Sequence, residues 1–209
     1  MNRMQALPAQ GELTHRLGEL LRIGVALSKE RDINRLLEAI LIAAKDITNA
    51  DGGTLYRMTD DQSLRFEIMR NDSLGIAMGG TSGADIPFYP VNLFDKEGRP
   101  VFSMVAAYAV HHDRSVNVSD AYTEAGFDFS GTKNFDKKTG YRSTSFLTVP
   151  MKNHEEEIIG VLQLINAQDP DGLVVRAPRW TPAGHSRNGA CKFSGPQREP
   201  VTPAVRRSS

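Results

Sequence analysis

The fold is decided by residues 33–58, INRLLEAILIAAKDITNADGGTLYRM, in which a helical pattern changes directly into a strand pattern. Apolar residues recur at three- and four-residue spacing from Ile33 to Ile47, which is typical of a helix with one buried face. Asp32 stands at the N-cap position, and the run from Asn49 to Gly53 ends the helix with residues that tolerate positive φ. The sequence therefore predicts an amphipathic helix followed by a strand at 54–58.

The segments on either side extend this pattern. Leucines at helical spacing predict an earlier helix at 12–28, and alternating apolar and charged residues predict a second strand at 64–70, joined to the first by a polar turn. Two apolar, β-rich runs around a charged turn predict a final hairpin, 145–151 with 158–165. The order of these segments indicates an α+β fold, an antiparallel sheet with its helices packed on one face.

The middle of the chain has a weaker pattern. Residues 71–100 are rich in glycine and predict a long loop, which is usually functional or mobile. A short buried helix is expected at 101–110, a strand at 115–118, and irregular structure at 120–138.

Composition limits the class of protein. The chain has 209 residues, of which 40% are apolar and 24% charged, as in a globular domain. It has no apolar run of membrane-spanning length and no signal-peptide pattern, so we expect a cytoplasmic protein without a membrane partner. Its single cysteine, Cys191, excludes an internal disulfide, and no metal site is predicted.

The C-terminal segment differs from the rest of the chain. From Gly172 onward there are seven Lys or Arg residues against one acid, together with five prolines and no apolar periodicity. This composition is typical of a solvated, disordered segment rather than a nucleic-acid-binding arm. We therefore expect a domain at 12–170 and a basic tail at 171–209 that is disordered or read from a different frame.

Four motifs resemble GAF domains, a family of regulatory modules. They are DGGTLY at 51–56, VNVSDAY at 116–122, TGYRS at 139–143 and IGVLQLIN at 159–166. Their order and spacing are most similar to the cyclic-nucleotide phosphodiesterase and cyclase branch and to GAF domains placed ahead of HD-GYP phosphodiesterases. In that family a long helix follows the last strand, and its pattern is missing here after Asn166.

The resemblance implies a ligand site between the sheet and the covering loops. The ligand would be a small molecule, with a cyclic nucleotide as the candidate and no other cofactor. Hydroxyl, amide and carboxylate groups would hold its polar atoms, and an apolar floor would stack a flat ring. Thr132 stands where related domains can place an aromatic residue on the base. The positions carried over are Thr54, Val105, Ala106, Thr132, Asp136, Thr139, Ser143 and Gln163.

Other motif residues have a structural interpretation. Arg142 is expected to pin a loop by pairing with Asp136 or Asp128, and Asp120 to shape a turn. Asn166 is expected to bond backbone at a strand end, with Asn117 in a similar role, and Gly160 to permit a bulge or a close approach.

Catalytic interpretations have less support. His111 and His112 are adjacent on the expected helix and point about 100° apart, which is poor geometry for a shared metal. Gly79 to Gly83 lacks the Gly-Lys-Ser/Thr ending of a phosphate loop. We therefore expect a homodimeric signal-sensing module that is not an enzyme. The alternatives are a fragment of an HD-GYP-type phosphodiesterase or cyclase, and a dimerisation module with an empty pocket.

Overall fold

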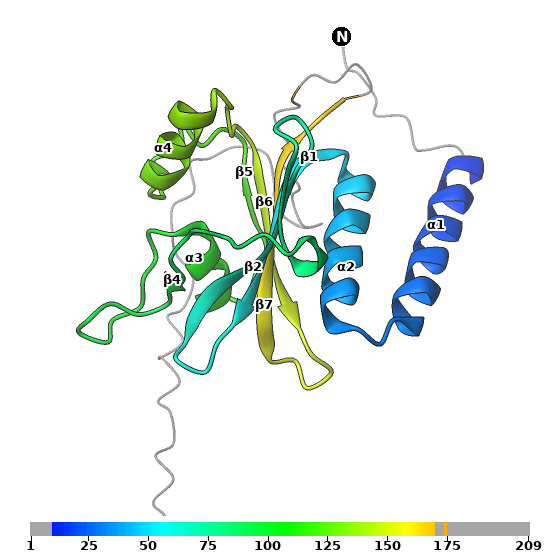
Figure 1. Ribbon diagram of the computed structural model, residues 1–209, viewed down its shortest axis with the longest axis horizontal. Helices are drawn as coiled ribbons and strands as arrows, with labels where there is room; N and C mark the ends of the chain where they lie inside the picture. Colours follow the sequence, from blue (N-terminus) through cyan, green and yellow to red (C-terminus); the bar gives the residue numbers. More distant parts are fainter. Residues whose placement is uncertain (1–9, 170–173, 175–209) are drawn as a thin grey trace, which may run out of the picture.

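A computed structural model describes residues 10–169 and Val174, and these residues form an antiparallel sheet of seven strands between helices (Figure 1). The helices are α1 Gln10–Lys29, α2 Ile33–Thr48, α3 Val105–His111 and α4 Ser130–Thr139, with a 3₁₀ turn, η1, at Gly80–Ser82. The strands are β1 Ala50–Met58, β2 Ser63–Asn71, β3 Ile76–Gly79, β4 Val91–Asn92, β5 Val116–Val118, β6 Phe146–Lys152 and β7 Ile158–Ala167.

Helix α2 begins and ends at the predicted residues. The Asp32 carboxylate accepts hydrogen bonds from the backbone N–H groups of Asn34 and Arg35, at 2.9 and 3.1 Å. Asn49 closes the helix in the left-handed conformation, with φ 49°. A Cβ on Gly53 would lie 2.7 Å from a Leu41 methyl group, so glycine at this position lets α2 pack closely on β1.

The strand order is β3-β2-β1-β7-β6-β5, and β4 pairs with β2 outside this path. The α+β class and the antiparallel sheet are therefore confirmed. The helices, however, lie on both faces of the sheet rather than on one: α1 and α2 cover one face, and α3 and α4 lie on the other (Figure 1). Strand β1 buries Leu55 on the first face and Tyr56 on the second, so both faces need a cover.

The two faces hold separate clusters of buried side chains. Under α2, Leu41 packs against Leu55, Ile68 and Leu164. On the opposite face, Ala106 and Ala107 of α3 pack near Tyr56, Leu64 and Val161, and a third cluster contains Val105, Phe129 and Phe146. The short alanine side chains let α3 pack close to the sheet.

Two expectations about the middle of the chain are wrong in detail. The expected loop at 71–100 contains β3, η1 and β4, and the expected irregular stretch at 120–138 contains most of α4. Strands β3 and β4 are short, four and two residues, and helix α4 buries mainly polar groups, so neither has the apolar periodicity of a long element.

The expectations about the tail at 171–209 and the missing C-terminal helix fall almost entirely outside the described residues. In the described part, β7 ends at Ala167 and Gln168 bridges to Val174. Within the same ranges, no helix is long and apolar enough to cross a bilayer.

Candidate functional site

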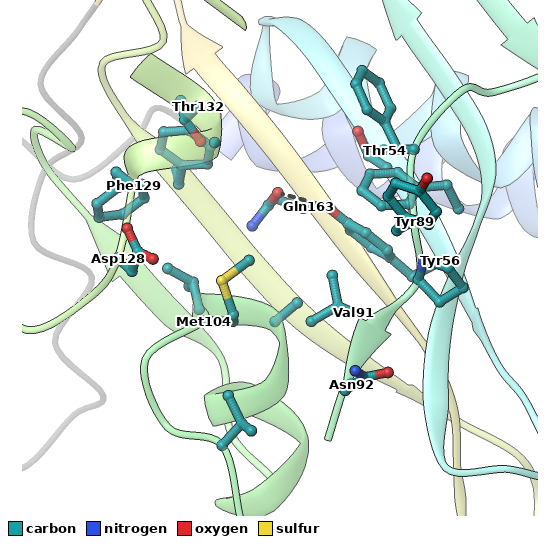
Figure 2. Close-up of a pocket in the computed structure, with 18 of the residues that line it drawn as sticks. Thr54, Tyr56, Tyr89, Val91, Asn92, Met104, Asp128, Phe129, Thr132 and Gln163 are labelled. Carbon is teal, nitrogen blue, oxygen red and sulfur yellow. Dashed lines mark hydrogen bonds between the residues drawn. The ribbon is translucent and has the colours of Figure 1, made fainter. Parts of the chain in front are cut away.

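A cavity of about 890 Å³ opens between the α3–α4 face of the sheet and the segments that cover it (Figure 2). Its floor comes from β1, β6 and β7, and its walls from the segment before β4, the start of α3, and α4. The residues that line it are Thr54, Tyr56, Phe66, Met69, Phe88, Tyr89, Pro90, Val91, Asn92, Phe94, Asp95, Lys96, Val101, Met104, Val105, Ala106, Asp128, Phe129, Gly131, Thr132, Phe135, Ser143, Phe146, Gln163 and Ile165.

The floor carries a polar row across an apolar surface. Thr54 pairs with Gln163 between β1 and β7, and Gln163 pairs with Thr148 between β7 and β6. The Tyr56 hydroxyl donates to Gln163 Oε1 at 3.2 Å, and Gln163 Nε2 donates to Thr148 Oγ1 at 3.0 Å. Burial raises the pKa of Tyr56, which therefore stays protonated. The Gln163 amide is thus held in place from both sides.

Two polar side chains on this floor can form further hydrogen bonds. The Thr54 side chain is buried, and its hydroxyl has no hydrogen-bond partner among the described residues. The Gln163 amide can make up to four hydrogen bonds and has two within the protein. A ligand resting on the floor would find one hydroxyl and one amide edge close together.

Aromatic side chains form one wall of the cavity. The ring centroids of Tyr56 and Phe66 are 4.7 Å apart, those of Phe66 and Phe88 5.4 Å, and those of Phe88 and Phe135 6.3 Å. This row runs from the sheet to α4 through the segment before β4. Such a wall suits a flat, ring-bearing molecule, because ring faces stack favourably against one another.

The cavity is open to solvent, and its exposed lining residues include large apolar side chains beside the polar Asn92, Lys96 and Asp128. Tyr89 is 94% exposed although it lines the cavity, and Phe88 and Met104 are 40% and 37% exposed. Exposed large apolar side chains around an opening often mark a binding groove.

Three charged residues line the cavity: Asp95, Lys96 and Asp128. Both oxygens of the Asp95 carboxylate are engaged by Arg99, at the backbone N–H and the guanidinium. The Asp128 carboxylate accepts a 2.8 Å hydrogen bond from the Ser130 N–H at the start of α4. That hydrogen bond lowers the pKa of Asp128, which therefore stays ionised at neutral pH.

Six of the eight predicted ligand positions line this cavity: Thr54, Val105, Ala106, Thr132, Ser143 and Gln163. Asp136 and Thr139 do not. Thr139 is exposed at the end of α4, where its hydroxyl donates to the Phe135 carbonyl at 3.0 Å.

Asp136 is buried behind the cavity wall and is saturated by protein donors. It accepts from the Tyr122 hydroxyl at 2.7 Å and from the Ser143 N–H and hydroxyl at 2.8 and 2.7 Å. These contacts join α4 to the segment before β6. Asp136 thus holds Ser143 in the cavity wall and does not face a ligand itself.

Arg142 pins this region in a different way from the one predicted. Its guanidinium lies over the Tyr122 ring, 4.0 Å from the centroid, and Tyr122 bonds to Asp136. The link between Arg142 and Asp136 therefore passes through an aromatic ring, as a cation–π contact.

The remaining motif residues organise backbone. The Asp120 carboxylate accepts from the Tyr122 N–H at 2.9 Å. Asn166 accepts from the Thr144 and Ser145 N–H groups and donates to the Arg142 carbonyl. Asn117 pairs with Leu147 in the sheet. A Cβ on Gly160 would lie 2.3 Å from the Tyr56 carbonyl oxygen, so this position requires glycine.

The aromatic wall and the Asp128 carboxylate were not predicted from the sequence. Phe135 lies one helical turn after Thr132, so a helical reading of 130–139 would have placed both on one face. The IPFYP run at 86–90 carried a signal of its own, because two aromatic residues between prolines are unusual in a polar loop.

The histidines raised as metal ligands lie apart from the cavity. His111 Nε2 is 2.7 Å from the Leu93 carbonyl oxygen, and the His112 ring stacks on Tyr108 with centroids 4.0 Å apart. In the part of the chain that the structure describes, no group of three His, Cys, Asp or Glu residues is arranged to hold a metal ion.

Part of the chain is similar in sequence to known proteins. The chain is 29% identical over 148 residues to the cGMP-specific 3′,5′-cyclic phosphodiesterase of Drosophila sechellia, and the match covers 67% of this chain and 11% of that protein. The enzyme of the same name from Drosophila melanogaster also shares 29% identity, with 12% of its length covered. The chain thus spans about a ninth of these curated relatives.

Solved GAF domains have a similar fold. The GAF domain of a phosphoenolpyruvate-protein phosphotransferase from Coxiella burnetii superimposes with a TM-score of 0.53 at 12% identity, covering 77% of this chain and 79% of that one. The corresponding Acinetobacter domain gives 0.51 at 16% identity, covering 74% and 78%. The family model described as "GAF domain" matches residues 32–183. The chain belongs to the GAF domain family.

Proposed function

We propose that this chain is a signal-sensing module that binds a small, ring-bearing molecule in the cavity between the sheet, α3 and α4. The observation that carries the proposal is the cavity itself. Its volume of about 890 Å³ lies in the range of small-molecule sites, and an aromatic wall and a few polar groups converge on it. Aromatic stacking would orient the ring, and Thr54 and Gln163 would bond its edge.

A cyclic nucleotide is the ligand class that we test first. The relatives that support it are named as cGMP-specific phosphodiesterases, and the chain covers only about a ninth of their length. Their catalytic activity is therefore not carried over to this chain. The proposed role here is to bind and report, not to turn over the nucleotide.

The proposed output is a change in a homodimer. Helix α1 exposes Leu20, Leu21 and Val25 by 50%, 71% and 54%, and α2 exposes Ile42 and Ile47 by 44% and 56%. A second copy of the chain would cover these side chains. Ligand binding would then favour one of two arrangements of the helices, provided that its affinity differs between them.

Titration calorimetry with cyclic GMP and cyclic AMP tests the binding proposal. We expect saturable heat with at least one nucleotide, and a tenfold or greater loss of affinity in Phe135→Ala, which removes part of the aromatic wall. Phe102→Ala is a matched control, since Phe102 is an exposed aromatic residue outside the cavity lining. Absence of heat with both nucleotides would exclude the cyclic-nucleotide version, and a heat unchanged in Phe135→Ala would exclude this cavity.

A further inference from the structure

A second, smaller groove lies on the α2 side of the sheet. It has a volume of about 350 Å³ and is formed by the start of α2, the end of β1 and the β6–β7 hairpin. Its lining includes the apolar side chains of Ile33, Leu37, Leu55, Met151 and Ile159. Ile33 and Ile159 are 60% and 47% exposed, so the described residues leave this groove open to solvent.

The rim of this groove is acidic. Five exposed carboxylates belong to the β1–β2 and β6–β7 turns: Asp60, Asp61, Glu155, Glu156 and Glu157. Figure 1 shows both turns at the same end of the sheet, next to the start of α2. The two basic residues beside these turns, Arg57 and Lys152, are already paired with carboxylates. An apolar groove with an acidic rim suits a segment that is both apolar and basic.

The chain turns back toward this groove where the sheet ends. Strand β7 runs from the groove to Ala167, and the next residue, Gln168, forms an antiparallel bridge with Val174. Because an antiparallel bridge reverses the chain direction, the chain leaves Val174 in the direction of the groove. Leu147 and Leu162, which are half-buried beside the cluster under α2, lie between the bridge and the groove.

The next residues in the sequence have the chemistry that the groove suits. Residues 175–182, VRAPRWTP, lie outside the described residues and contain two arginines, no acid and Trp180, the single tryptophan of the chain. Trp180 is six residues beyond the bridge, and six extended residues span about 20 Å. Six residues of β7 also lead from Gln168 back to Leu162, which pairs with Leu55 in the groove. Trp180 is therefore within reach of the groove.

We infer that residues 175–182 dock in this groove of their own chain, with the Trp180 ring against Ile33 and Ile159 and the two arginines facing the carboxylates of the turns. A tryptophan side chain can bury about 150–250 Å² and covers the apolar surface that α2 leaves open. For these eight residues, docking replaces the disorder expected from composition. The inference is independent of ligand binding in the large cavity.

The fluorescence of Trp180 tests this inference directly, because the chain has no other tryptophan. We expect emission to the blue of a free peptide of residues 175–182, and about fivefold weaker quenching by acrylamide, as for a ring docked in about 80% of the molecules. Both should be the same at nanomolar and micromolar protein. Emission and quenching equal to those of the free peptide would overturn the inference. Protection that grows with protein concentration would overturn it in favour of docking between two copies.

Variants of the groove show whether the ring is bound at this place. Ile33→Asp and Ile159→Asp each introduce a charge at an exposed position, and each should raise quenching to the level of the free peptide. Ile42→Asp, at a similarly exposed isoleucine of α2 outside the groove, and Phe88→Asp, at the large cavity, should leave quenching unchanged. Protection that survives both groove variants, or that is lost equally in a control, contradicts the inference.

A variant of the segment itself leaves the described domain unaltered. Arg176→Glu combined with Arg179→Glu replaces attraction to the acidic rim by repulsion and should raise quenching severalfold. Lys192→Glu combined with Arg198→Glu, the same charge change farther along the tail, is the matched control and should have a smaller effect. Equal quenching in the wild type and the Arg176/Arg179 variant would overturn the docked arrangement.

Discussion

At the scale of single residues, the structure separates side chains that face the cavity from side chains that support its walls. Gln163 and Thr54 lie on the floor and keep polar capacity for a ligand, whereas Asp136 spends its capacity on Tyr122 and Ser143. Both groups of side chains are buried and polar, so residue type alone does not distinguish them. They differ in the number of hydrogen bonds that each side chain makes within the protein.

The supporting role of Asp136 predicts a loss of stability on substitution. Asp136→Ala leaves the buried Ser143 N–H and hydroxyl without their acceptor, and we expect the free energy of unfolding to fall by about 3 kcal/mol. Urea unfolding followed by circular dichroism measures it. Asp46→Ala, on the exposed side of α2, should change stability by less than about 0.5 kcal/mol. A stable Asp136→Ala variant with impaired ligand binding would instead assign Asp136 to the ligand.

At the scale of elements, the sheet is held together by contacts that cross from strand to loop. The Asp51 carboxylate in β1 accepts from the Ser73 N–H and hydroxyl after β2 and from the Tyr141 hydroxyl before β6. Tyr141 in turn accepts from Asn166 in β7 at 2.9 Å. One buried carboxylate thus links the two halves of the sheet at the end where β1 begins.

This link predicts a particular acid response. Burial alone would raise the pKa of Asp51, but its hydrogen bonds from Ser73 and Tyr141 leave that pKa below the usual value. The unfolded chain then binds more protons, so the contribution to stability is complete above about pH 4 and is lost as the pH falls through the lower folded pKa. Asp51→Asn should therefore cost most stability at neutral pH and progressively less toward pH 2. Chemical denaturation at several pH values measures this, and a constant difference would be contrary evidence.

Replacing glycine with alanine should have opposite effects on stability in β7 and in α1. Gly160→Ala in β7 would place a Cβ 2.3 Å from the Tyr56 carbonyl oxygen, and the strands cannot separate without losing hydrogen bonds. We expect a loss of at least about 2 kcal/mol. Gly18→Ala in the exposed part of α1 meets no atom within 4 Å and should be neutral or stabilising by up to about 1 kcal/mol. Thermal unfolding of the pair checks both, and a harmless Gly160→Ala would refute the close packing of β1 on β7.

The elements with strong apolar periodicity were predictable from the sequence, and those held by polar groups were not. Helix α2 and strands β2, β6 and β7 follow from their patterns and from the cap at Asp32. Helix α4 escaped because its buried face centres on Asp136, whose partners come from Tyr122 and Ser143. Hydrophobic periodicity cannot register a face that is buried through hydrogen bonds.

The candidate site was predictable only where its residues lie on elements with a regular sequence pattern. Positions on the regular strands, Thr54 and Gln163, line the cavity as the family motifs imply. Phe88, Tyr89 and Asp128 belong to segments without a regular pattern, and their approach to the cavity depends on tertiary contacts such as the bond from the Asp128 N–H to Ser103. The spacing of residues along the chain does not predict such tertiary contacts.

At the scale of the whole molecule, the two faces of the sheet have different roles in the proposed mechanism. The cavity is lined by residues of α3 and α4, and the exposed apolar side chains belong to α1 and α2. Figure 1 shows these two pairs of helices on opposite faces of the sheet. A signal would have to cross the sheet between them. Strand β1 is suited to this, because Tyr56 lies against the cavity and its neighbour Leu55 lies in the cluster under α2.

The proposed dimer predicts the effect of a charge on α1. Leu21 and Val25 are four residues apart and therefore share a helix face. Leu21→Glu should shift a dimer to monomer in sedimentation velocity at micromolar concentration, because a carboxylate buried at the interface would be unpaired. Arg22→Glu, a charge change at an adjacent exposed position, is the comparison variant. A wild-type protein that sediments as a monomer at every concentration would contradict the proposed dimer.

The proposed function depends on the cavity between the sheet, α3 and α4 being a small-molecule site. A crystal structure of the protein grown with cyclic GMP or cyclic AMP, whichever gives heat, tests it most directly. We expect density for a flat ring against Phe135, with its edge within hydrogen-bond distance of Gln163 and Thr54. A nucleotide bound elsewhere, or a cavity closed by Phe88 and Tyr89 with no ligand inside, would contradict it.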